Sequence, residues 1–468
     1  MSIDSLMNQD IKTRCNEAYE KVVAYQDKLN ATITAIDPKD IDYDKLEGKL
    51  KGIPVALKDN VSTKGIKTTA ASRILDNYYP VYDATIVEKL RKEGAVFVSK
   101  ASMDELAMGG SNLTSMIGPC HNPYDLNRIS GGSSGGSAVL VASGAVSVAI
   151  GSDTGDSVRK PAGYCGVVGV KPTYGRISRY GIIPYASSLD HVGYFTRNIK
   201  DASLVLEVLA GRDDHDMTSS FEKVDEYSKL LNSNVEGKKI LVFDNVVENI
   251  REDIIINSFN NVIKGLEEKG AVIKHVRFDD KLMKALFPTY FIIANAEATA
   301  NHSNLDGIRF GHRVDGNTME EIMINTRTRG FSSFIKQRFV VGSYSLFEEN
   351  QERLLKKAQR VRRLIVDEVM KELKDADCLI APASGNVAPL IKGNKSDELA
   401  PEYLIAENHL VIGNFGGLPS LTQPMGFKDN LPFGVNITCN PFKEADMFNI
   451  ALAIEEITGL KDLVKEDF

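Results

Sequence analysis

Short blocks of apolar residues alternate with polar stretches along the chain, and their spacing predicts alternating helices and strands. Residues 5–35 have the period of an amphipathic helix, and residues 53–57 form an apolar run that predicts a buried strand. Residues 84–92 again have helical spacing, and residues 95–98 predict a second strand. Because strands and helices that alternate in this way are typical of α/β proteins, we expect an α/β fold.

The second half of the chain continues this pattern with longer helices. Residues 240–243 predict a strand and residues 252–268 a helix, while residues 348–374 predict a long, charged amphipathic helix. Residues 384–402 contain Gly, Pro and Lys and are expected to form an exposed loop, and residues 445–458 predict a C-terminal helix.

The composition is that of an ordinary globular protein. Of the 468 residues, 43% are hydrophobic and 25% are charged, so a sizeable core is available. The net charge of −7 does not favour a nucleic-acid-binding protein, which usually has a basic face. We find no repeat and no clear boundary, so we expect one domain over residues 1–468.

The N-terminus and the cysteines indicate a soluble, cytoplasmic protein. Residues 1–21 lack the apolar core of a signal peptide. The longest apolar run, residues 139–150, is too short to span a membrane and is expected to be a buried helix. The five cysteines are scattered without a C-x-x-C pair, and the seven histidines show no H-E-x-x-H motif, so no metal site is expected.

Residues 129–181 differ from the rest of the chain, because they hold 12 of the 37 glycines together with many serines. A flexible linker can share that composition, but linkers are polar. Here the glycines separate apolar blocks such as residues 139–150 and 164–170. The pattern therefore indicates a packed core with tight backbone turns.

Two short segments match familiar catalytic motifs, but the rest of the chain lacks the features that these motifs require. Residues 131–135 fit the G-x-S-x-G nucleophile elbow, but that motif follows an apolar strand, and residues 124–130 are mostly polar. Residues 153–155 resemble the Asp-Thr-Gly loop of aspartic proteases, which need two carboxylates in one site, and no second copy occurs. The P-loop motif for binding ATP is absent.

One set of residues remains that can cleave an amide bond, namely Lys58, Ser133 and Ser157. A serine hydroxyl needs an adjacent base, and a lysine can be that base when burial lowers its pKa. A second serine can carry the proton where the lysine and the nucleophile do not touch. Glycines near Ser157 allow backbone N–H groups to face a developing oxyanion. From the pattern alone, Ser133 as a helix cap and Lys58 as a surface charge remain open.

The order of these motifs resembles the amidase-signature family. The resemblance is carried by residues 131–181, which begin GGSSGGSA and continue through GSDTGDSVRKPAGYCG, and by residues 52–60 around the lysine. Residues 103–109 and 416–420 match as well, so the resemblance covers nearly the whole chain. It implies an α/β fold with a large mixed β-sheet core covered by helices on both faces.

The resemblance also implies the roles of the catalytic residues. In a Ser-Ser-Lys mechanism, Ser157 is the nucleophile, Ser133 the bridging serine and Lys58 the general base. The oxyanion hole would consist of the backbone N–H groups of consecutive residues, which are Thr154, Gly155, Asp156 and Ser157.

Within the family, the chain is similar to the glutaminase subunits of tRNA-dependent amidotransferases. Residues 306–311, 330–342 and 186–190 carry this likeness. It implies that glutamine is the substrate, that Arg338 binds its α-carboxylate and that Glu407 replaces the usual aspartate for its α-amino group. A fixed cation and a fixed anion would select a free amino acid over a simple amide.

The likeness implies an assembly as well. A B subunit would bind the tRNA and use ATP and magnesium, and a small C subunit would tie the two larger subunits together. Ammonia from glutamine would serve to convert Glu-tRNA(Gln) to Gln-tRNA(Gln). No cofactor is expected in this chain itself.

Two positions depart from the family pattern. Asp156 stands where glycine is usual, and Glu407 is one methylene longer than the usual aspartate. Aspartate tolerates a left-handed backbone, so the turn is expected to form, but a carboxylate that faced the pocket would oppose the oxyanion. We expect Asp156 to point outward, toward Lys160, where the family often has glutamine.

Two other functions remain open. A stand-alone amidase for small amides would share the Ser-Ser-Lys core without needing Arg338 and Glu407, which would then form a surface pair. A catalytically inactive subunit would use the glycine-rich scaffold only to hold a partner. The presence of Lys58, Ser133 and Ser157 argues against this second alternative.

Overall fold

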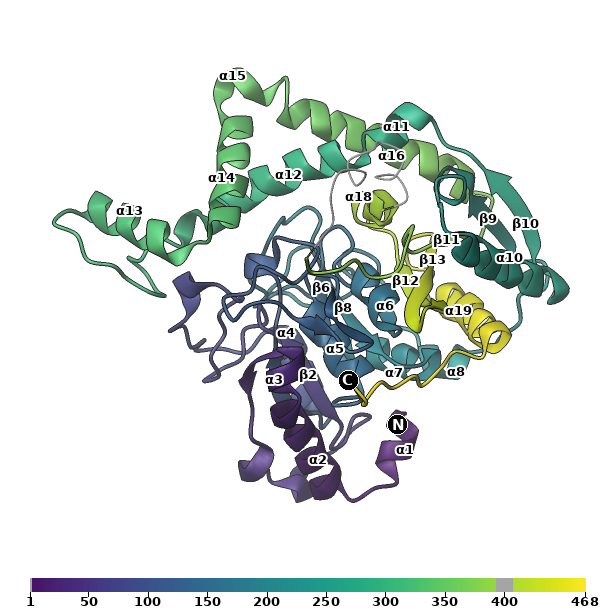
Figure 1. Ribbon diagram of the computed structural model, residues 1–468, viewed down its shortest axis with the longest axis horizontal. Coiled ribbons are helices and arrows are strands. Elements are labelled where there is room, and N and C mark those ends of the chain that lie inside the picture. Colours follow the sequence, from purple (N-terminus) through teal and green to yellow (C-terminus); the bar gives the residue numbers. More distant parts are fainter. Residues whose placement is uncertain (1, 393–406) are drawn as a thin grey trace.

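One mixed sheet of 11 strands forms the centre of the molecule in the computed structural model, which describes residues 2–392 and 407–468 (Figure 1). The strand order is β1-β3-β2-β6-β8-β7-β12-β13-β11-β9-β10. These strands are β1 (Thr32–Ala35), β2 (Pro54–Lys58), β3 (Val96–Ala101), β6 (Val148–Asp153), β7 (Val168–Lys171), β8 (His191–Thr196), β9 (Lys239–Phe243), β10 (Val272–Val276), β11 (Cys378–Pro382), β12 (Ser420–Lys428) and β13 (Leu431–Cys439). A separate hairpin pairs β4 (His121–Asn122) with β5 (Asp125–Ile129).

Parallel and antiparallel pairs both occur in the large sheet. Strand β2 runs parallel to β3 and β6, and β9 runs parallel to β10 and β11. The remaining neighbours pair in the antiparallel sense. The expected α/β fold with a large mixed sheet is thereby confirmed.

Helices cover both faces of the sheet. Along β12, Thr422 lies close to Gly163 of α6, whereas the side chain of Gln423 donates a hydrogen bond to the Ala451 carbonyl of α19. Because consecutive residues of a strand point to opposite faces, α6 and α19 lie on opposite sides. The helices are α1 (Ile3–Met7), α2 (Ile11–Ala24), α3 (Gln26–Leu29), α4 (Thr85–Lys92), α5 (Gly135–Ala142), α6 (Arg159–Cys165), α7 (Ile199–Leu209), α8 (Tyr227–Leu230), α9 (Asp244–Val247), α10 (Asp253–Glu268), α11 (Asp280–Lys284), α12 (Leu286–Asn301), α13 (Met319–Gly330), α14 (Ser333–Leu346), α15 (Glu348–Gln351), α16 (Leu355–Leu373), α18 (Ile412–Phe415) and α19 (Glu444–Thr458).

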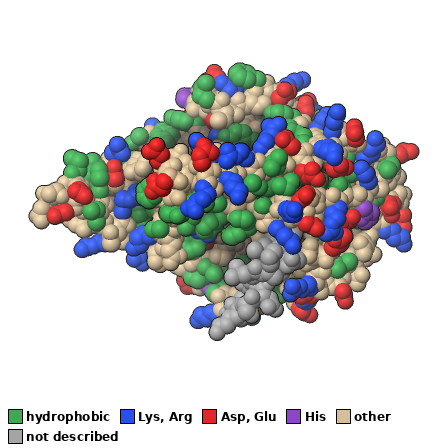
Figure 2. Space-filling view, turned by 90° about the horizontal axis from the view of Figure 1, so that it is seen from above, with side chains coloured by type: hydrophobic (Ala, Val, Ile, Leu, Met, Phe, Trp, Pro, Cys, Tyr) green, Lys and Arg blue, Asp and Glu red, His purple; other side chains and the backbone are tan. Residues whose placement is uncertain are grey.

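Helices α12 to α16 form a layer at the top of Figure 1, and α13 extends away from the sheet. Figure 2 views the molecule from this side and shows hydrophobic side chains interspersed with charges of both signs. The exposed apolar residues of these helices include Val340, Tyr344 and Leu364. Tyr290 of α12 contacts Gly155, so the layer reaches the loop that follows β6.

Strands β2 and β6 bring the candidate catalytic segments together. They are parallel neighbours in which Leu57 pairs with Ile150, and every side chain in both strands is buried. Their carboxyl ends therefore meet at one edge of the sheet, with Lys58 at the end of β2 and Asp153 at the end of β6.

The expectation of one helix over residues 5–35 is wrong. The segment holds the end of α1, helices α2 and α3, and strand β1. Asp10 begins α2 by accepting a hydrogen bond from the Thr13 N–H, and Asn30, in the left-handed conformation, ends α3. The following residues then pair with β3.

The expectation of one buried helix over residues 139–150 is also wrong. Helix α5 ends at Ala142, Gly144 turns the chain with a φ of +69°, and β6 begins at Val148. The burial was predicted, but a fully buried strand cannot be told from a buried helix by periodicity alone.

The other expected elements agree with the structure, with two differences at residues 348–374 and 384–402. Residues 348–374 form two helices, α15 and α16, separated at Glu352–Leu354. Residues 384–392, the described part of 384–402, contain no helix or strand, but Ser384, Val387 and Ala388 are buried, so the expectation of an exposed loop is wrong for these residues. Residues 393–402 lie outside the described residues.

Three further observations concern membranes, metals and disulfides. No helix within residues 2–392 and 407–468 is long and apolar enough to cross a membrane. The same residues contain no group of three or more His, Cys, Asp or Glu side chains placed to hold a metal ion. All five cysteines are buried and free.

Candidate active site

Lys58 is fully buried, and its Nζ atom is surrounded by serine oxygens. It lies 2.7 Å from Ser133 Oγ, 2.8 Å from Ser134 Oγ and 2.9 Å from Ser152 Oγ. No carboxylate of the described residues forms an ion pair with it. Burial lowers the pKa of Lys58 to about 7, although the surrounding carboxylates of Asp104, Asp153 and Asp190 oppose this shift.

The hydrogen bonds around Lys58 allow the neutral amine to accept a proton from Ser133. Ser134 Oγ donates to the Ser152 carbonyl at 3.0 Å, so it accepts from Lys58. Ser152 Oγ accepts from Asn60 Nδ2 at 3.1 Å and also contacts Lys58 Nζ. Lys58 Nζ also lies 3.3 Å from the Ser152 carbonyl oxygen. When Lys58 is neutral, its two N–H groups can go to Ser134 Oγ and to the Ser152 carbonyl, which leaves its lone pair for a serine hydroxyl such as that of Ser133, as a general base requires.

Ser133 and Ser157 lie on two loops that a main-chain hydrogen bond joins. The N–H of Ser134 donates to the Ser157 carbonyl at 3.2 Å, and both candidate serines are buried. Within the described chain the two serine side chains do not hydrogen-bond to each other, and the Ser157 hydroxyl has no partner. The structure thus joins Lys58 to Ser133 directly and leaves the Ser157 hydroxyl unengaged.

The turn at residues 154–157 presents unpaired backbone N–H groups. None of the N–H groups of Thr154, Gly155, Asp156 and Ser157 donates a hydrogen bond to any described residue. The next N–H, of Val158, donates to the Asp153 carboxylate at 2.9 Å. Unpaired N–H groups in a buried turn are rare, and successive ones form a concave site for an anion.

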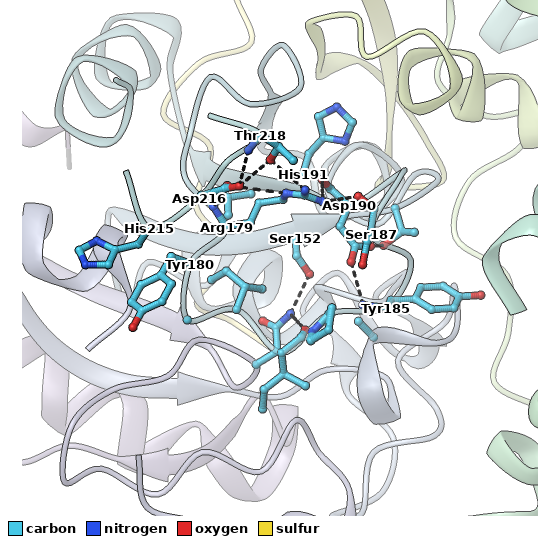
Figure 3. Close-up of a pocket in the computed structure, with 18 of the residues that line it drawn as sticks. Ser152, Arg179, Tyr180, Tyr185, Ser187, Asp190, His191, His215, Asp216 and Thr218 are labelled. Carbon is cyan, nitrogen blue, oxygen red and sulfur yellow. Dashed lines mark hydrogen bonds and ion pairs between the residues drawn. The ribbon is translucent and has the colours of Figure 1, made fainter. Parts of the chain in front are cut away.

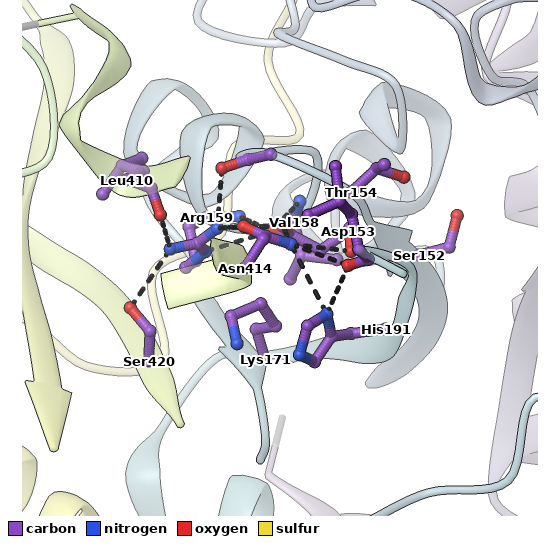
Figure 4. Close-up of polar contacts among 12 residues, drawn as sticks. Ser152, Asp153, Thr154, Val158, Arg159, Lys171, His191, Leu410, Asn414 and Ser420 are labelled. Atoms are coloured by element: carbon purple, nitrogen blue, oxygen red, sulfur yellow. Dashed lines mark hydrogen bonds and ion pairs between the residues drawn. The ribbon is translucent and has the colours of Figure 1, made fainter. Parts of the chain in front are cut away.

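A buried ion pair between Asp153 and Arg159 holds this turn in place (Figure 4). Arg159 Nη2 lies 2.9 Å from Asp153 Oδ1 and also donates to the Gly155 carbonyl at 2.8 Å. Asn414 Nδ2 donates to Asp153 Oδ1 at 3.0 Å. Although burial by itself would raise it, the pKa of Asp153 is held well below its ordinary value by Arg159. The hydrogen bond from Arg159 to the Gly155 carbonyl oxygen thus fixes the orientation of this peptide group within the turn.

Two further contacts position the turn. Thr154 Oγ1 donates to Asp190 Oδ1 at 2.7 Å, and Asp190 also accepts from the backbone N–H groups of Tyr185 and Ala186. On the other side, a Cβ atom added to Gly155 would lie 3.0 Å from Tyr290 Cε2, so Tyr290 packs directly on the turn. Glycine is needed at position 155 for this close approach.

A separate cavity of about 360 Å³ borders Ser152 and Thr154 (Figure 3). Two buried atoms of its lining residues, Asn60 Oδ1 and His191 Nε2, have no hydrogen-bond partner among the described residues. Ser157 and Arg338 do not line it. This cavity is therefore not the space in which Ser157 would meet a substrate.

Arg338 of α14 presents a cation without an anionic partner. Its guanidinium carbon lies 4.5 Å from the ring centroid of Phe291 and 4.7 Å from that of Phe334. It forms no ion pair with a carboxylate in the described part of the chain. Its positive charge partly offsets the effect of burial, which raises the pKa of Tyr290, so Arg338 lies close to the residue that packs on Gly155. The arrangement leaves the guanidinium free to bind an anionic ligand.

Glu407 has partners within the protein. Its Oε2 atom lies 2.7 Å from Lys160 Nζ and 3.4 Å from the Tyr164 hydroxyl, and its Oε1 atom accepts from the Gly385 N–H at 2.7 Å. Lys160, which we expected to face Asp156, pairs with Glu407 instead.

Asp156 is half-buried and has no side-chain hydrogen bond or ion pair with any described residue. Burial raises the pKa of its carboxyl to about 6, although Lys160 acts in the opposite direction. Its carboxylate contributes to the raised pKa of Tyr290, so it also lies near that ring. Asp156 is thus an unpaired acid beside the candidate nucleophile.

The groups that support the candidate catalytic residues were not recognised in the sequence. They are Asn60, Ser134, Ser152, Asp153, Arg159, Asp190, Tyr290 and Asn414. Asp153 and Arg159 lie inside the motif that carries the family resemblance, which was the available signal. Tyr290 and Asn414 lie in ordinary helical segments, where nothing in the sequence marks them.

The sequence profile of the family described as Amidase matches residues 8–448. The A subunit of the glutamyl-tRNA(Gln) amidotransferase of Fusobacterium nucleatum is 40% identical over 466 residues, which cover 97% of this chain and 94% of that protein. The protein of the same name from Thermotoga maritima is 42% identical over 410 residues, covering 88% of this chain and 85% of the relative.

Solved structures agree with the sequence comparison. The crystal structure of the A subunit of the Thermotoga maritima glutamyl-tRNA(Gln) amidotransferase has a TM-score of 0.84 at 36% identity, covering 100% of this chain and 98% of that one. A peptide amidase from Stenotrophomonas maltophilia also has a TM-score of 0.84, at 27% identity, covering 100% of this chain and 99% of that one.

Proposed function

The chain belongs to the amidase family, and on this premise we propose that it is the glutaminase subunit of a tRNA-dependent amidotransferase. It hydrolyses glutamine and supplies ammonia for the conversion of Glu-tRNA(Gln) to Gln-tRNA(Gln). The hydrogen bond of 2.7 Å between Lys58 Nζ and Ser133 Oγ carries the proposal of amide cleavage. The choice of assembly rests on the relatives from Fusobacterium nucleatum and Thermotoga maritima, which match over most of their length.

The reaction begins with neutral Lys58. Lys58 Nζ takes the proton of Ser133 Oγ, and Ser133 takes that of Ser157 Oγ, which attacks the side-chain amide carbon of glutamine. The oxyanion of the tetrahedral intermediate is bound by the unpaired N–H groups of residues 154–157. This step forms the Ser157 Oγ–carbon bond and leaves the proton on Lys58.

The relay then runs in reverse. The proton returns through Ser133 to the amide nitrogen, the carbon–nitrogen bond breaks, and ammonia leaves a glutamyl ester on Ser157. Water attacks this ester while Lys58 again accepts a proton through Ser133. The bond between Ser157 Oγ and the carbonyl carbon then breaks, the proton returns from Lys58 through Ser133 to Ser157 Oγ, and glutamate is released.

Arg338 binds the α-carboxylate of glutamine in this proposal. Its unpaired guanidinium, stacked between Phe291 and Phe334, supports this role, because arginine binds a carboxylate with two parallel hydrogen bonds. Glu407 is assigned to the same site because it stands where the family pattern has the aspartate for the α-amino group. Its carboxylate forms an ion pair with Lys160.

The partners follow from the same proposal. A B subunit binds the tRNA and uses ATP and magnesium, a small C subunit ties the larger two together, and the assembly works in the cytoplasm. No step of the mechanism in this chain passes through ATP or magnesium.

Ammonia release from glutamine tests the function. It should be measured for the wild-type chain and for Ser157→Ala, each with and without the B and C subunits. We expect release by the wild type and loss with Ser157→Ala. No release from any wild-type mixture would support an inactive subunit, and equal release from simple amides would support a stand-alone amidase.

A further inference from the structure

A free amino acid carries an ammonium and a carboxylate on one carbon, so a site that selects glutamine needs an anion and a cation close together. Arg338 offers the cation. Two acids, Glu407 and Asp156, lie near the turn that holds Ser157, and their surroundings differ.

Glu407 is already neutralised within the protein. Its pair with Lys160 has side chains only 14% and 6% exposed, and Lys160 Nζ also donates to the Glu407 carbonyl at 2.7 Å. With the Gly385 N–H and the Tyr164 hydroxyl, every oxygen of the carboxylate has a donor. An incoming ammonium would have to displace Lys160 to gain a full charge partner.

Asp156 has the opposite character. Its carboxylate is half-buried and unpaired within the described residues, and it carries the raised pKa expected of an acid without a counter-charge. Because Lys160 is held by Glu407, the nearest cation does not form an ion pair with Asp156. A buried carboxylate of this kind costs free energy until a cation binds it.

Asp156 and Arg338 act on the same neighbour. Tyr290 packs on Gly155, the residue before Asp156. Burial raises the pKa of the Tyr290 phenol, the charge of Asp156 raises it further, and the charge of Arg338 acts in the opposite direction. Phe291, the next residue of α12, stacks on the Arg338 guanidinium. An unpaired anion and an unpaired cation, both among the described residues, therefore lie near one aromatic side chain, beside the nucleophile.

We propose that Asp156, rather than Glu407, binds the α-ammonium group of the substrate, and that Glu407 is a positioning residue that keeps Lys160 away from Asp156. This assignment rests on the proposed function. It also removes a difficulty of the site, since an ammonium bound to Asp156 cancels the negative charge that would otherwise oppose the oxyanion.

The test compares two substrates that differ only in the α-amino group, glutamine and 4-carbamoylbutanoate. The kcat/KM for ammonia release is measured for both with the complete complex, for the wild type, Asp156→Asn and Glu407→Gln. We expect Asp156→Asn to lower the ratio of glutamine to 4-carbamoylbutanoate by about 10- to 100-fold. Glu407→Gln frees Lys160 to pair with Asp156 and should also lower the ratio, whereas Glu407→Gln combined with Lys160→Gln leaves Asp156 unpaired and should keep the ratio within about twofold of the wild type.

Asp156→Gly provides a second variant, since glycine adopts the backbone of the turn without strain and removes the carboxylate. It should lower the ratio as Asp156→Asn does. A ratio that falls only in Glu407→Gln, or that neither Asp156 variant moves, would overturn the assignment and leave the glutaminase intact. A wild-type complex that releases no ammonia from glutamine would overturn the proposed function, and the assignment with it.

Discussion

Lys58 Nζ lies 2.7 Å from Ser133 Oγ, and its other close contacts are the Ser134 and Ser152 hydroxyl oxygens and the Ser152 carbonyl oxygen. The amine is thus placed to accept a proton from Ser133. This relationship makes the protonation state of Lys58 the first quantity to test.

Activity should depend on pH through Lys58. Burial lowers its pKa to about 7, so the neutral base is present above that pH and is lost as the pH falls below it. We expect kcat for ammonia release to rise with pH, with a midpoint near 7. Lys58→Arg should reduce kcat by at least about 100-fold at every pH, because a guanidinium stays protonated. A kcat that is independent of pH between 6 and 8 (roughly one unit on each side of the expected midpoint) would contradict the role of Lys58.

Removal of either serine hydroxyl should abolish or greatly reduce ammonia release. Ser157→Ala removes the nucleophile, and a loss on the order of 10⁴-fold or more is expected. Ser133→Ala interrupts the proton relay and should cost about 10²- to 10⁴-fold in kcat. The matched control is Ser137→Ala in helix α5, which follows Ser133, because this hydroxyl donates only to the Ile150 carbonyl at 2.8 Å. An equal loss in all three variants would indicate unfolding, which circular dichroism would detect.

Arg338→Ala should raise KM for glutamine without a matching loss for an amide that lacks a carboxylate, such as propanamide. A lost charge-assisted contact predicts a decrease of about 10- to 100-fold in kcat/KM for glutamine. Lys336→Ala is the control, because this exposed cation lies on the same helix and donates to the Thr328 carbonyl at 3.2 Å. If Arg338→Ala hydrolyses glutamine at the wild-type rate, a stand-alone amidase becomes the better description.

The Asp153–Arg159 pair should contribute strongly to stability. Asp153→Asn leaves a buried guanidinium without its counter-charge, so a loss of about 3–5 kcal/mol in the free energy of unfolding is expected, measured by urea denaturation. The pKa of Asp153 is lowered, so its contribution is present above the ordinary carboxyl value of about 4 and is lost as the pH falls below it.

The control for this prediction is Asp42→Asn, which removes an exposed ion pair with Lys45 at 2.7 Å. A surface pair of this kind is worth less than about 1 kcal/mol. Equal losses for the two variants would show that the buried pair adds nothing beyond the surface one.

Some elements of the fold and the site were predictable from the sequence, and others were not. Strand β2, with Lys58 at its end, follows from an apolar run whose short length favours a strand over a helix. By contrast, the run over residues 139–150 was mistaken for one helix, because apolarity reports burial and not conformation. Gly144 was the residue that divided it, and its positive φ is decided by the chain packed around it.

The sequence by itself determined the class of chemistry, because the types, order and spacing of Lys58, Ser133 and Ser157 are properties of the linear chain. Only the tertiary structure decided whether those groups are in a state to react. The neutral form of Lys58 depends on burial, and the free acid beside Ser157 is Asp156 because Lys160 meets Glu407, which lies far from it along the chain. Which charged groups pair with each other depends on distances in the folded chain, and the local sequence pattern does not contain those distances.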